Sequence, residues 1–417
     1  MKPAGRIEAQ PWMTSAPTRA VIAALTADGG VARFVGGCVR DAYLERSVED
    51  VDIATSEPPD RVVKLLKSAG IKAVPTGIAH GTVTAVVPPE HYEITTLRED
   101  VETHGRHATV AYTDDWRADA ARRDLTMNAL FLDPDGTLYD PFDGLKDLRA
   151  GRVRFVGEAR TRIEEDYLRL LRFFRFHAYY GRSEPDADGL AACRELAPHL
   201  EKLSAERVWA ETRKLLLAPS PEAVFALMAE TGVLAHVLPH AGEVARLGLL
   251  AAREAAHDEP DAIRRLAAVL DLTTAHAETT AIVLKLSNAE RDQLEAIARE
   301  WPRFAIESGA PARRSLYRLG AARVYDLILL RWAEAERLAG ASIDDAPFRE
   351  ALDEAAAWMP KALPVQGVDV LTLGVPAGPA VGEILRQAEA WWIDRDFKPD
   401  RAALLKQLKT LANPQIA

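Results

Sequence analysis

The hydrophobic pattern of the chain changes character near residue 157. Before that point, short apolar runs with alternating polarity predict strands at VARFVGG, VEDVDIAT, GTVTAVVP, HYEITTLR and NALFLDPDGTLYD, the last with an Asp-Gly turn signal. Between them, DRVVKLLKSAG predicts an amphipathic helix that ends at glycine. Residues 18–150 therefore predict an α/β or α+β module.

After residue 157 the strand pattern stops. Apolar residues recur at helical spacing in YLRLLRFFRF, RVWAETRKLLL, AVFALMAETGVL and RVYDLILLRWAEAERL. Prolines interrupt this periodicity at Pro219 and Pro221, near Pro302, and from Pro360 to Pro364. We therefore expect an all-helical second part with joints at these prolines.

Length and composition limit the class of protein. A chain of 417 residues exceeds what one hydrophobic core usually organises, so we expect two to four packed modules. No apolar run is long enough to cross a bilayer, and residues 1–17 contain no leader pattern, so we expect a flexible N-terminus and a cytoplasmic protein without a membrane partner. Cys38 and Cys193 are too few for a disulfide framework or a zinc site and predict free thiols.

The charge of the chain is distributed unevenly. Its net charge of −10 argues against a protein that coats nucleic acid through bulk positive charge. Residues 151–182 nevertheless contain eight arginines and four acids. This basic segment fits either a groove for phosphates or a solvated helix face, and composition alone favours the helix face.

A glycine turn and an acidic strand follow each other in FVGGCVRDAYLERSVEDVDIAT, residues 34–55. A predicted strand leads into Gly36 and Gly37, and a helix that begins near Val39 directs its amides and Arg40 toward the space above the turn. Backbone N–H groups can approach a triphosphate closely at such a turn, and the helix N-terminus adds partial positive charge. A glycine pair by itself is more often a plain turn.

Three carboxylates fit a magnesium site beside that turn. Asp50 and Asp52 lie two residues apart on a predicted strand, so both side chains face the same side. Glu93, in the strand HYEITTLR, supplies a third hard oxygen ligand, and such ligands fit magnesium better than zinc. Two Mg²⁺ ions held in this way would activate an attacking oxygen and steady a triphosphate. The pattern predicts nucleotidyl transfer without a nucleophilic side chain.

The order of several motifs resembles that of a known family. GGCVRD followed by DVD resembles the active-site signature of the DNA polymerase β superfamily, in the form found in class II CCA-adding enzymes and bacterial poly(A) polymerases. Similar segments follow in the family's order: ARRDLTMNAL, YDPFDGLKDLRAGRVRFVG, EEDYLRLLRFFRF, LSAERVWAE and GVDVLTLGVPAGPAVGEIL. The matches run from residue 34 to residue 385, and residues 213–366 carry no recognisable motif.

The resemblance implies an α+β fold. It consists of a polymerase-β-like nucleotidyltransferase head with a mainly antiparallel sheet, followed by all-helical neck, body and tail domains. After the flexible residues 1–17, the expected domains are the catalytic head 18–157, the neck 158–218 with a nucleotide-selecting helix, the body 219–360 and the tRNA-binding tail 361–417.

Two of the similar segments carry the nucleotide-binding residues of the head. The residues so assigned are Gly36, Gly37, Arg40, Asp41, Arg122, Arg123, Asp124 and Asn128. By resemblance, Arg122 and Arg123 would contact the triphosphate. Asp124 would accept hydrogen bonds from ribose hydroxyls, which favours ribonucleotides, and Asn128 would help to fix the loop.

The segment EEDYLRLLRFFRF predicts one helix with a polar side. Asp166, Arg169, Arg172 and Arg175 recur every three residues and would line that side. The resemblance implies that Asp166 and Arg169 act as an amino-acid template. A carboxylate accepts from the exocyclic amine of C or A, a guanidinium donates to ring acceptors, and uracil and guanine present a carbonyl in place of the amine. Arg172 and Arg175 would then contact phosphates or orient the template.

Residues 98–119 are the least regular part of the predicted head. They are rich in polar side chains, with His104, Gly105, Arg106 and His107 in succession. They lie where related enzymes carry a mobile loop that helps the change from C to A addition. We therefore expect a loop here, without roles for its individual residues.

The resemblance implies an enzyme that adds CCA to the 3′ end of tRNA without a nucleic-acid template. Its substrates would be CTP, ATP and tRNA bound by the acceptor and T arms, and no protein partner is implied. A poly(A) polymerase or a partial CC- or A-adding enzyme has the same motifs. A non-catalytic RNA-binding protein with the same fold is a third alternative, which intact Asp50, Asp52 and Arg40 disfavour because unneeded buried charges are costly.

Overall fold

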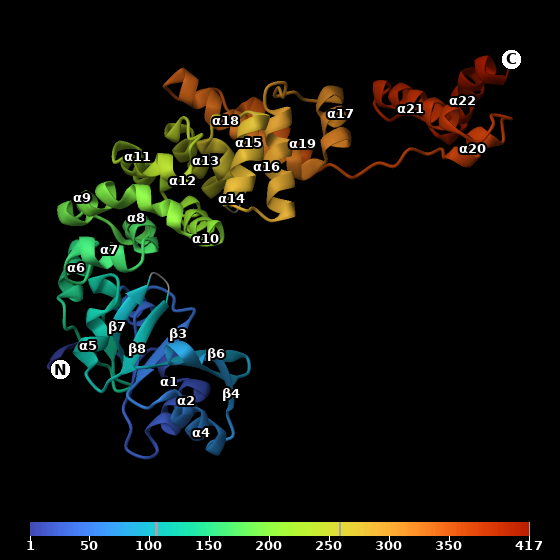
Figure 1. Ribbon diagram of the computed structural model, residues 1–417. Coiled ribbons are helices and arrows are strands. Elements are labelled where there is room, and N and C mark those ends of the chain that lie inside the picture. The colour runs from blue at the N-terminus through green and yellow to red at the C-terminus, as the bar shows by residue number, and fades with distance from the viewer. Residues whose placement is uncertain (105–106, 258–259, 417) are drawn as a thin grey trace. The chain divides into compact units, whose positions relative to one another are not determined.

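Strands are confined to the first third of the chain in the computed structural model, which describes residues 1–104, 107–257 and 260–416 (Figure 1). Within these ranges, only helices and connections follow the last strand. The chain forms two compact units. Unit 1 comprises Met1–Ala241 and Val283–Lys285, and unit 2 comprises Gly242–Ile282 and Leu286–Ala417.

Eight strands of unit 1 form one sheet in the order β1-β10-β9-β2-β3-β6-β5-β4. The strands are β1 (Pro3–Arg6), β2 (Ala32–Val35), β3 (Val51–Thr55), β4 (Lys72–Gly77), β5 (Thr82–Val87), β6 (Glu90–Thr96), β9 (Phe131–Leu132) and β10 (Thr137–Tyr139). All neighbours are antiparallel except β3 and β6, which are parallel. The expected α+β fold with a mainly antiparallel sheet is confirmed.

Alternation along β3 and β6 separates a polar face of the sheet from an apolar face. Asp52 pairs in register with Glu93, so both side chains point to the same face. Tyr92 and Ile94 point to the opposite face, where both are buried and the Tyr92 hydroxyl lies 3.0 Å from that of Thr18. The helices that pack on this apolar face are α2 (Ala16–Thr26) and α4 (Pro59–Ser68).

The N-terminal residues 1–17 are more ordered than we expected. Strand β1 pairs with β10 at the sheet edge, and α1 (Pro11–Thr14) follows. Ile7 and Met13 are buried. No pattern in the sequence indicates this strand, because PAGR has no apolar alternation and is held mainly by backbone pairing.

Residues 98–119 also form regular structure instead of the expected loop. They contain the two-stranded sheet of β7 (Arg98–His104) and β8 (His107–Tyr112), followed by α5 (Trp116–Ala121). Gly105 and Arg106 lie outside the described residues. A polar hairpin is stabilised by backbone hydrogen bonds between its strands, so hydrophobic periodicity does not reveal it.

The predicted helix EEDYLRLLRFFRF is divided in two. Helix α7 (Ala159–Glu165) ends before Asp166, whose backbone is extended at φ −155° and ψ 106°, and α8 (Leu168–Tyr180) begins two residues later. Asp166 therefore lies in extended backbone between two helices and not on the surface of one continuous helix. The other helices of unit 1 are α3 (Gly37–Tyr43), α6 (Gly144–Ala150), α9 (Ala187–Leu196), α10 (Ala205–Leu216), α11 (Pro221–Glu230), α12 (Val233–Val237) and the short 3₁₀ turns Ile78–His80, Thr126–Asn128 and Ala197–Lys202.

Unit 2 is helical throughout its described residues. Its helices are α13 (Val244–His257), α14 (Ala262–Val269), α15 (Thr274–Val283, whose last residue belongs to unit 1), α16 (Asn288–Glu300), α17 (Ala310–Leu319), α18 (Ala321–Ala339), α19 (Ala346–Ala356), α20 (Gly367–Leu371), α21 (Pro379–Asp394) and α22 (Arg401–Ile416). Its C-terminal helices pack around a separate core that includes Val370, Trp392 and Leu404. Among the described residues, no helix is both long and apolar enough to span a membrane.

Candidate active site

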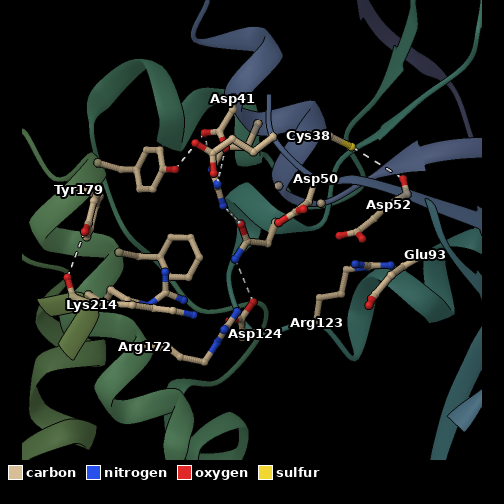
Figure 2. Close-up of a pocket in the computed structure, with 18 of the residues that line it drawn as sticks. Cys38, Asp41, Asp50, Asp52, Glu93, Arg123, Asp124, Arg172, Tyr179 and Lys214 are labelled. Atoms are coloured by element: carbon tan, nitrogen blue, oxygen red, sulfur yellow. Dashed lines mark hydrogen bonds and ion pairs between the residues drawn. The ribbon is translucent and has the colours of Figure 1, made fainter. Parts of the chain in front are cut away.

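A cavity of about 1230 Å³ lies in unit 1 between the polar face of the sheet and the helices α8 and α10 (Figure 2). All residues that the sequence assigned to a site line this one cavity. They are Gly36, Gly37, Arg40, Asp41, Asp50, Asp52, Glu93, Arg122, Arg123, Asp124, Asn128, Asp166, Arg169, Arg172 and Arg175. Segments separated by more than a hundred residues in sequence therefore meet at one place.

The glycine turn joins β2 to α3. Gly36 has a φ of +74°, a left-handed conformation that favours glycine, and α3 begins directly at Gly37, two residues earlier than expected. Cys38 is buried behind the turn, where its thiol donates to the carbonyl of Val35 at 3.3 Å. Burial raises the pKa of Cys38 to about 12, so its sulfur stays protonated and is not a metal ligand.

One side of the cavity carries Asp50, Asp52 and Glu93, which we call the strand wall. Asp50 directly precedes β3, and Asp52 and Glu93 are register partners on β3 and β6. Burial, together with the charges of Glu93 and Asp50, raises the pKa of Asp52 to about 6, although Arg123 opposes this rise. Among the described residues, no lysine or arginine forms an ion pair with these three carboxylates. The strand wall is a concentration of negative charge that Arg123 offsets only in part.

The strand wall carries the type of side chain that binds divalent cations, although its three carboxylates do not converge on one position. In the part of the chain that the structure describes, no three His, Cys, Asp or Glu side chains are grouped closely enough to hold a metal ion as they stand. The donor set nevertheless fits, because three carboxylates supply the hard oxygen ligands that Mg²⁺ prefers. The repulsion that raises the pKa of Asp52 would also be relieved by a bound cation.

Arg122 and Arg123 are anchored by an acid that the sequence analysis missed. Asp119, only 1% exposed, pairs with Arg122 at 2.7 Å and with Arg123 at 2.9 Å. Burial by itself would raise the pKa of Asp119, but the two guanidinium groups hold it below its ordinary value. The spacing of Asp119, three residues before Arg122 and four before Arg123, could have identified this acid, because side chains at these spacings come together on a helix.

Asp124 is enclosed by protein donors. Its carboxylate accepts from the backbone N–H of Leu125 at 2.8 Å, from the Asn128 amide at 3.1 Å and from Arg172 at 2.6 Å. Burial would raise the pKa of Asp124, but the Arg172 charge and these hydrogen bonds lower it to about 2. The expected link between Asn128 and this loop is therefore a direct hydrogen bond.

Asp166 and Arg169 line the cavity together, each with a partner of its own. Asp166 forms an ion pair with Arg207 of α10 at 2.7 Å. Arg169 donates to Glu165 at 2.5 Å and to the backbone carbonyl of Arg122 at 3.1 Å. We call Asp124, Asp166 and their arginine partners Arg172 and Arg207 the helix wall; Figure 2 shows Arg172 across the cavity from Asp52 and Glu93.

Arg40 and Arg175 are also engaged with protein groups. Arg40 donates to Asn128 at 2.7 Å and pairs with Asp41 at 2.7 Å. Arg175 pairs with Glu211 of α10 at 2.5 Å. Further lining residues that sequence reasoning did not assign are Arg46, His91, Tyr179, Tyr180, Arg207 and Lys214. Arg207 and Glu211 belong to the segment LSAERVWAE, whose individual residues have no role in the sequence-based assignment.

Comparison with known families first identifies the class of the two parts of unit 1. Residues 32–154 match the family described as the poly A polymerase head domain. Residues 184–243 match the family described as a probable RNA and SrmB-binding site of polymerase A. The head and its charged cavity thus have the architecture of a template-independent RNA nucleotidyltransferase.

Comparison with individual proteins covers nearly the whole chain. It is 35% identical to the mitochondrial CCA tRNA nucleotidyltransferase 1 of Danio rerio, over 90% of this chain and 86% of that protein. It is 32% identical to the CCA-adding enzyme of Lactobacillus johnsonii, over 90% and 92% of the two chains. The crystal structure of the Bacillus stearothermophilus CCA-adding enzyme in complex with CTP superimposes with a TM-score of 0.78 at 31% identity, covering 94% of this chain and 96% of that one. The chain belongs to the family of CCA-adding tRNA nucleotidyltransferases.

Proposed function

We propose that this protein adds CCA to the 3′ end of tRNA, using CTP and ATP and releasing pyrophosphate, without a nucleic-acid template. The observation that carries the proposal is the single cavity in which the glycine turn, the strand wall and Asp166 with Arg169 meet. Relatedness to CCA-adding enzymes over 90% of the chain supports the same function.

The strand wall is the proposed site of two Mg²⁺ ions, with Asp50, Asp52 and Glu93 as ligands. When bound, the ions would activate the 3′ hydroxyl of the RNA and stabilise the negative charge of the triphosphate and of departing pyrophosphate. The protein's own contribution is to hold Asp50 directly before a rigid strand and to fix Asp52 beside Glu93 by parallel strand pairing.

The triphosphate is proposed to bind between the glycine turn and the arginines of the α5 segment. Arg122 and Arg123 are held in place by the buried Asp119, so little side-chain entropy is lost when they contact phosphate oxygens. The open backbone at Gly36 and Gly37 lets N–H groups approach the same oxygens. Asp124 can offer its remaining lone pairs to a ribose hydroxyl, since each carboxylate oxygen accepts more than one hydrogen bond.

Base selection is proposed to depend on Asp166 and Arg169. The carboxylate would accept from the exocyclic amine of C or A, and the guanidinium would donate to the neighbouring ring acceptor. The break between α7 and α8 lets the Asp166 side chain face the cavity from extended backbone. Uracil or guanine would place a carbonyl oxygen against this carboxylate and leave two acceptors facing each other.

The helical remainder is proposed to hold the acceptor and T arms of tRNA through shape and phosphate contacts. The proposed division of labour follows the expected boundaries: head 18–157, neck 158–218, body 219–360 and tail 361–417. Cytoplasmic tRNA is the proposed substrate, as the protein would meet it together with CTP and ATP in that compartment.

One incorporation experiment tests the proposal. The purified protein is incubated with a tRNA that ends at the discriminator base and with CTP, ATP or both, and the added nucleotides are sequenced. We expect two C residues with CTP alone and complete CCA with both. Long A tracts would support a poly(A) polymerase instead, addition of only CC or only A would support a partial enzyme, and binding without any addition would support a non-catalytic RNA-binding protein.

A further inference from the structure

Tyr180, the last residue of α8, reaches across to α3, the helix that follows the glycine turn. Its hydroxyl donates to the carboxylate of Asp41 at 2.9 Å. Two guanidinium groups lie over its ring, with the Arg40 carbon 4.4 Å and the Arg46 carbon 4.5 Å from the ring centroid. One side chain thus contacts α3 through a hydrogen bond and also through cation–π interactions on α3 and on the loop that follows it.

These contacts form a closed polar network. Asp41 accepts from two nitrogens of Arg40, at 3.0 and 2.7 Å, in addition to the Tyr180 hydroxyl. Arg40 is only 8% exposed, and Asp41 and Tyr180 are half-buried. A hydrogen bond to a carboxylate is strong when water has little access to it, so the orientation of α3 at this point is well defined.

The network continues through further contacts to the second turn of α8. Arg40 also donates to Asn128, which donates to Asp124, and Asp124 pairs with Arg172 near the start of α8. Helix α8 therefore contacts the residues around the glycine turn at two places. One contact runs through Arg172 in the second turn of α8, and the other through Tyr180, its last residue. Two attachments fix the direction of a helix, whereas one would leave it free to pivot.

Arg46 extends the same attachment toward the strand wall. It lies in the short connection between α3 and β3, four residues before Asp50. Besides stacking on the Tyr180 ring, its guanidinium donates to the backbone carbonyl of Tyr179 at 3.1 Å. The C-terminal end of α8 thereby also restrains the connection that leads into the carboxylates.

We propose that Tyr180 is a positioning residue for nucleotidyl transfer, which holds α3 and the following connection against α8. This inference rests on the proposed function, because the two sides that it aligns are the triphosphate turn with the strand wall and the base-selecting segment with Asp166 and Arg169. Tyr180 acts through Asp41, Arg40 and Arg46, and not by contact with the reacting atoms. A small error in this alignment lowers the rate of the chemical step more than it lowers substrate binding.

Two substitutions separate the hydroxyl from the ring. Tyr180→Phe removes the hydrogen bond to Asp41 and keeps the ring that contacts the two arginines, whereas Tyr180→Leu removes both. We expect kcat for CTP incorporation to fall about 10-fold in Tyr180→Phe and about 50-fold in Tyr180→Leu, within the range of losses known for positioning errors, while KM changes less than about twofold.

Tyr139→Phe is the matched control. The Tyr139 hydroxyl donates to Asp133 at 2.7 Å within the same unit, so this variant also loses one tyrosine–carboxylate hydrogen bond, but Tyr139 does not line the cavity. We expect similar melting temperatures for Tyr139→Phe and Tyr180→Phe, with wild-type kcat only in the control. Equal kcat in both variants, or a loss in Tyr180→Phe that vanishes when activity is corrected for the folded fraction, would overturn the inference.

A double-mutant cycle tests whether Tyr180 acts through Asp41. In the background of Asp41→Ala, adding Tyr180→Phe should lower kcat by less than about twofold, because the hydroxyl has already lost its acceptor. A full additional 10-fold loss would contradict the proposed route. Wild-type protein that adds no nucleotides would overturn the proposed function and this inference together, whereas active wild type with an unaffected Tyr180→Phe overturns only the inference.

Discussion

The carboxylates on the two walls of the cavity have pKa values that are shifted in opposite directions. On the helix wall, Asp124 is paired with Arg172 and Asp166 with Arg207, and the pKa of Asp124 is lowered to about 2. On the strand wall, burial and neighbouring carboxylates raise the pKa of Asp52 to about 6. The same residue type thus stands in two electrostatic environments within one cavity.

The difference indicates how each wall serves the proposed reaction. A carboxylate that already has a guanidinium partner is positioned and remains ionised, which suits base selection and the fixing of a loop. Carboxylates that repel one another are held in place by strand pairing and are stabilised only when a cation arrives. We therefore expect substitutions on the strand wall to affect catalysis with little loss of stability, and substitutions on the helix wall to affect specificity or stability.

Asp52→Asn tests the strand wall and should have the largest effect. The amide keeps the size of the side chain but loses the charge that would bind Mg²⁺, so kcat for CTP addition should fall about 1000-fold or more. Binding of tRNA in a filter or mobility-shift assay should persist. Glu90→Gln, which removes an exposed carboxylate on the same strand as Glu93, is the control and should retain activity. Substantial activity in Asp52→Asn would contradict the proposed role of the strand wall in binding Mg²⁺.

Asp166→Ala tests selectivity on the helix wall. Loss of the carboxylate removes the acceptor for the exocyclic amine, so the ratio of kcat/KM for CTP to that for UTP should fall about 10- to 100-fold. Single-nucleotide incorporation with each nucleotide measures this ratio. Asp188→Ala, at an exposed carboxylate in the first turn of α9, is the control. Unchanged rejection of UTP would remove Asp166 from the proposed template.

Asp124→Asn tests stability on the helix wall. Because the folded pKa of Asp124 is about 2 and the ordinary value is 3.8, ionisation of this group stabilises the folded protein by about 2 kcal/mol above pH 4. This contribution is lost as the pH falls from 4 toward 2. In denaturant unfolding, Asp124→Asn should be less stable by about that amount at pH 7, and the difference should narrow in acid. A constant difference at all pH values would argue against the ion pair as its cause.

Addition of Mg²⁺ should produce the smallest effect. A cation that relieves the repulsion around Asp52 stabilises the folded state by about 1.4 kcal/mol at ten times its dissociation constant, or about 2 °C in melting temperature for a protein of this size. Melting curves at pH 7.5 with and without Mg²⁺ measure the shift. It should disappear in Asp52→Asn and persist in Asp124→Asn; an equal shift in all three proteins would place cation binding elsewhere.

Several elements of the fold could be predicted because their burial leaves a pattern in the sequence. The runs that form β2, β3, β5 and β6 alternate or are continuously apolar, and the change to helices near residue 157 was correct. Strand β1 and the hairpin β7–β8 were missed because backbone pairing at a sheet edge needs no particular side chains. The break at Asp166 was missed because the periodicity of its neighbours continues across it.

Many of the residues that line the cavity could also be identified from the sequence, but their pairing could not. Motif order was enough to bring Asp52, Glu93 and Asp166 into one proposed site. The partners Arg207 and Tyr180 required coordinates, because an interaction between distant segments leaves no local signature, whereas Asp119 could have been found from its spacing to Arg122 and Arg123.

The sequence by itself determined the α+β head, the helical remainder and the residues of the proposed site, because these follow from periodicity and from residue types at fixed spacing. Tertiary structure alone decided which charges are neutralised. Electrostatic energy depends on distance and burial in three dimensions. Asp124 therefore forms an ion pair with Arg172, whereas Asp52, the same residue type, lies beside other carboxylates in the proposed cation site.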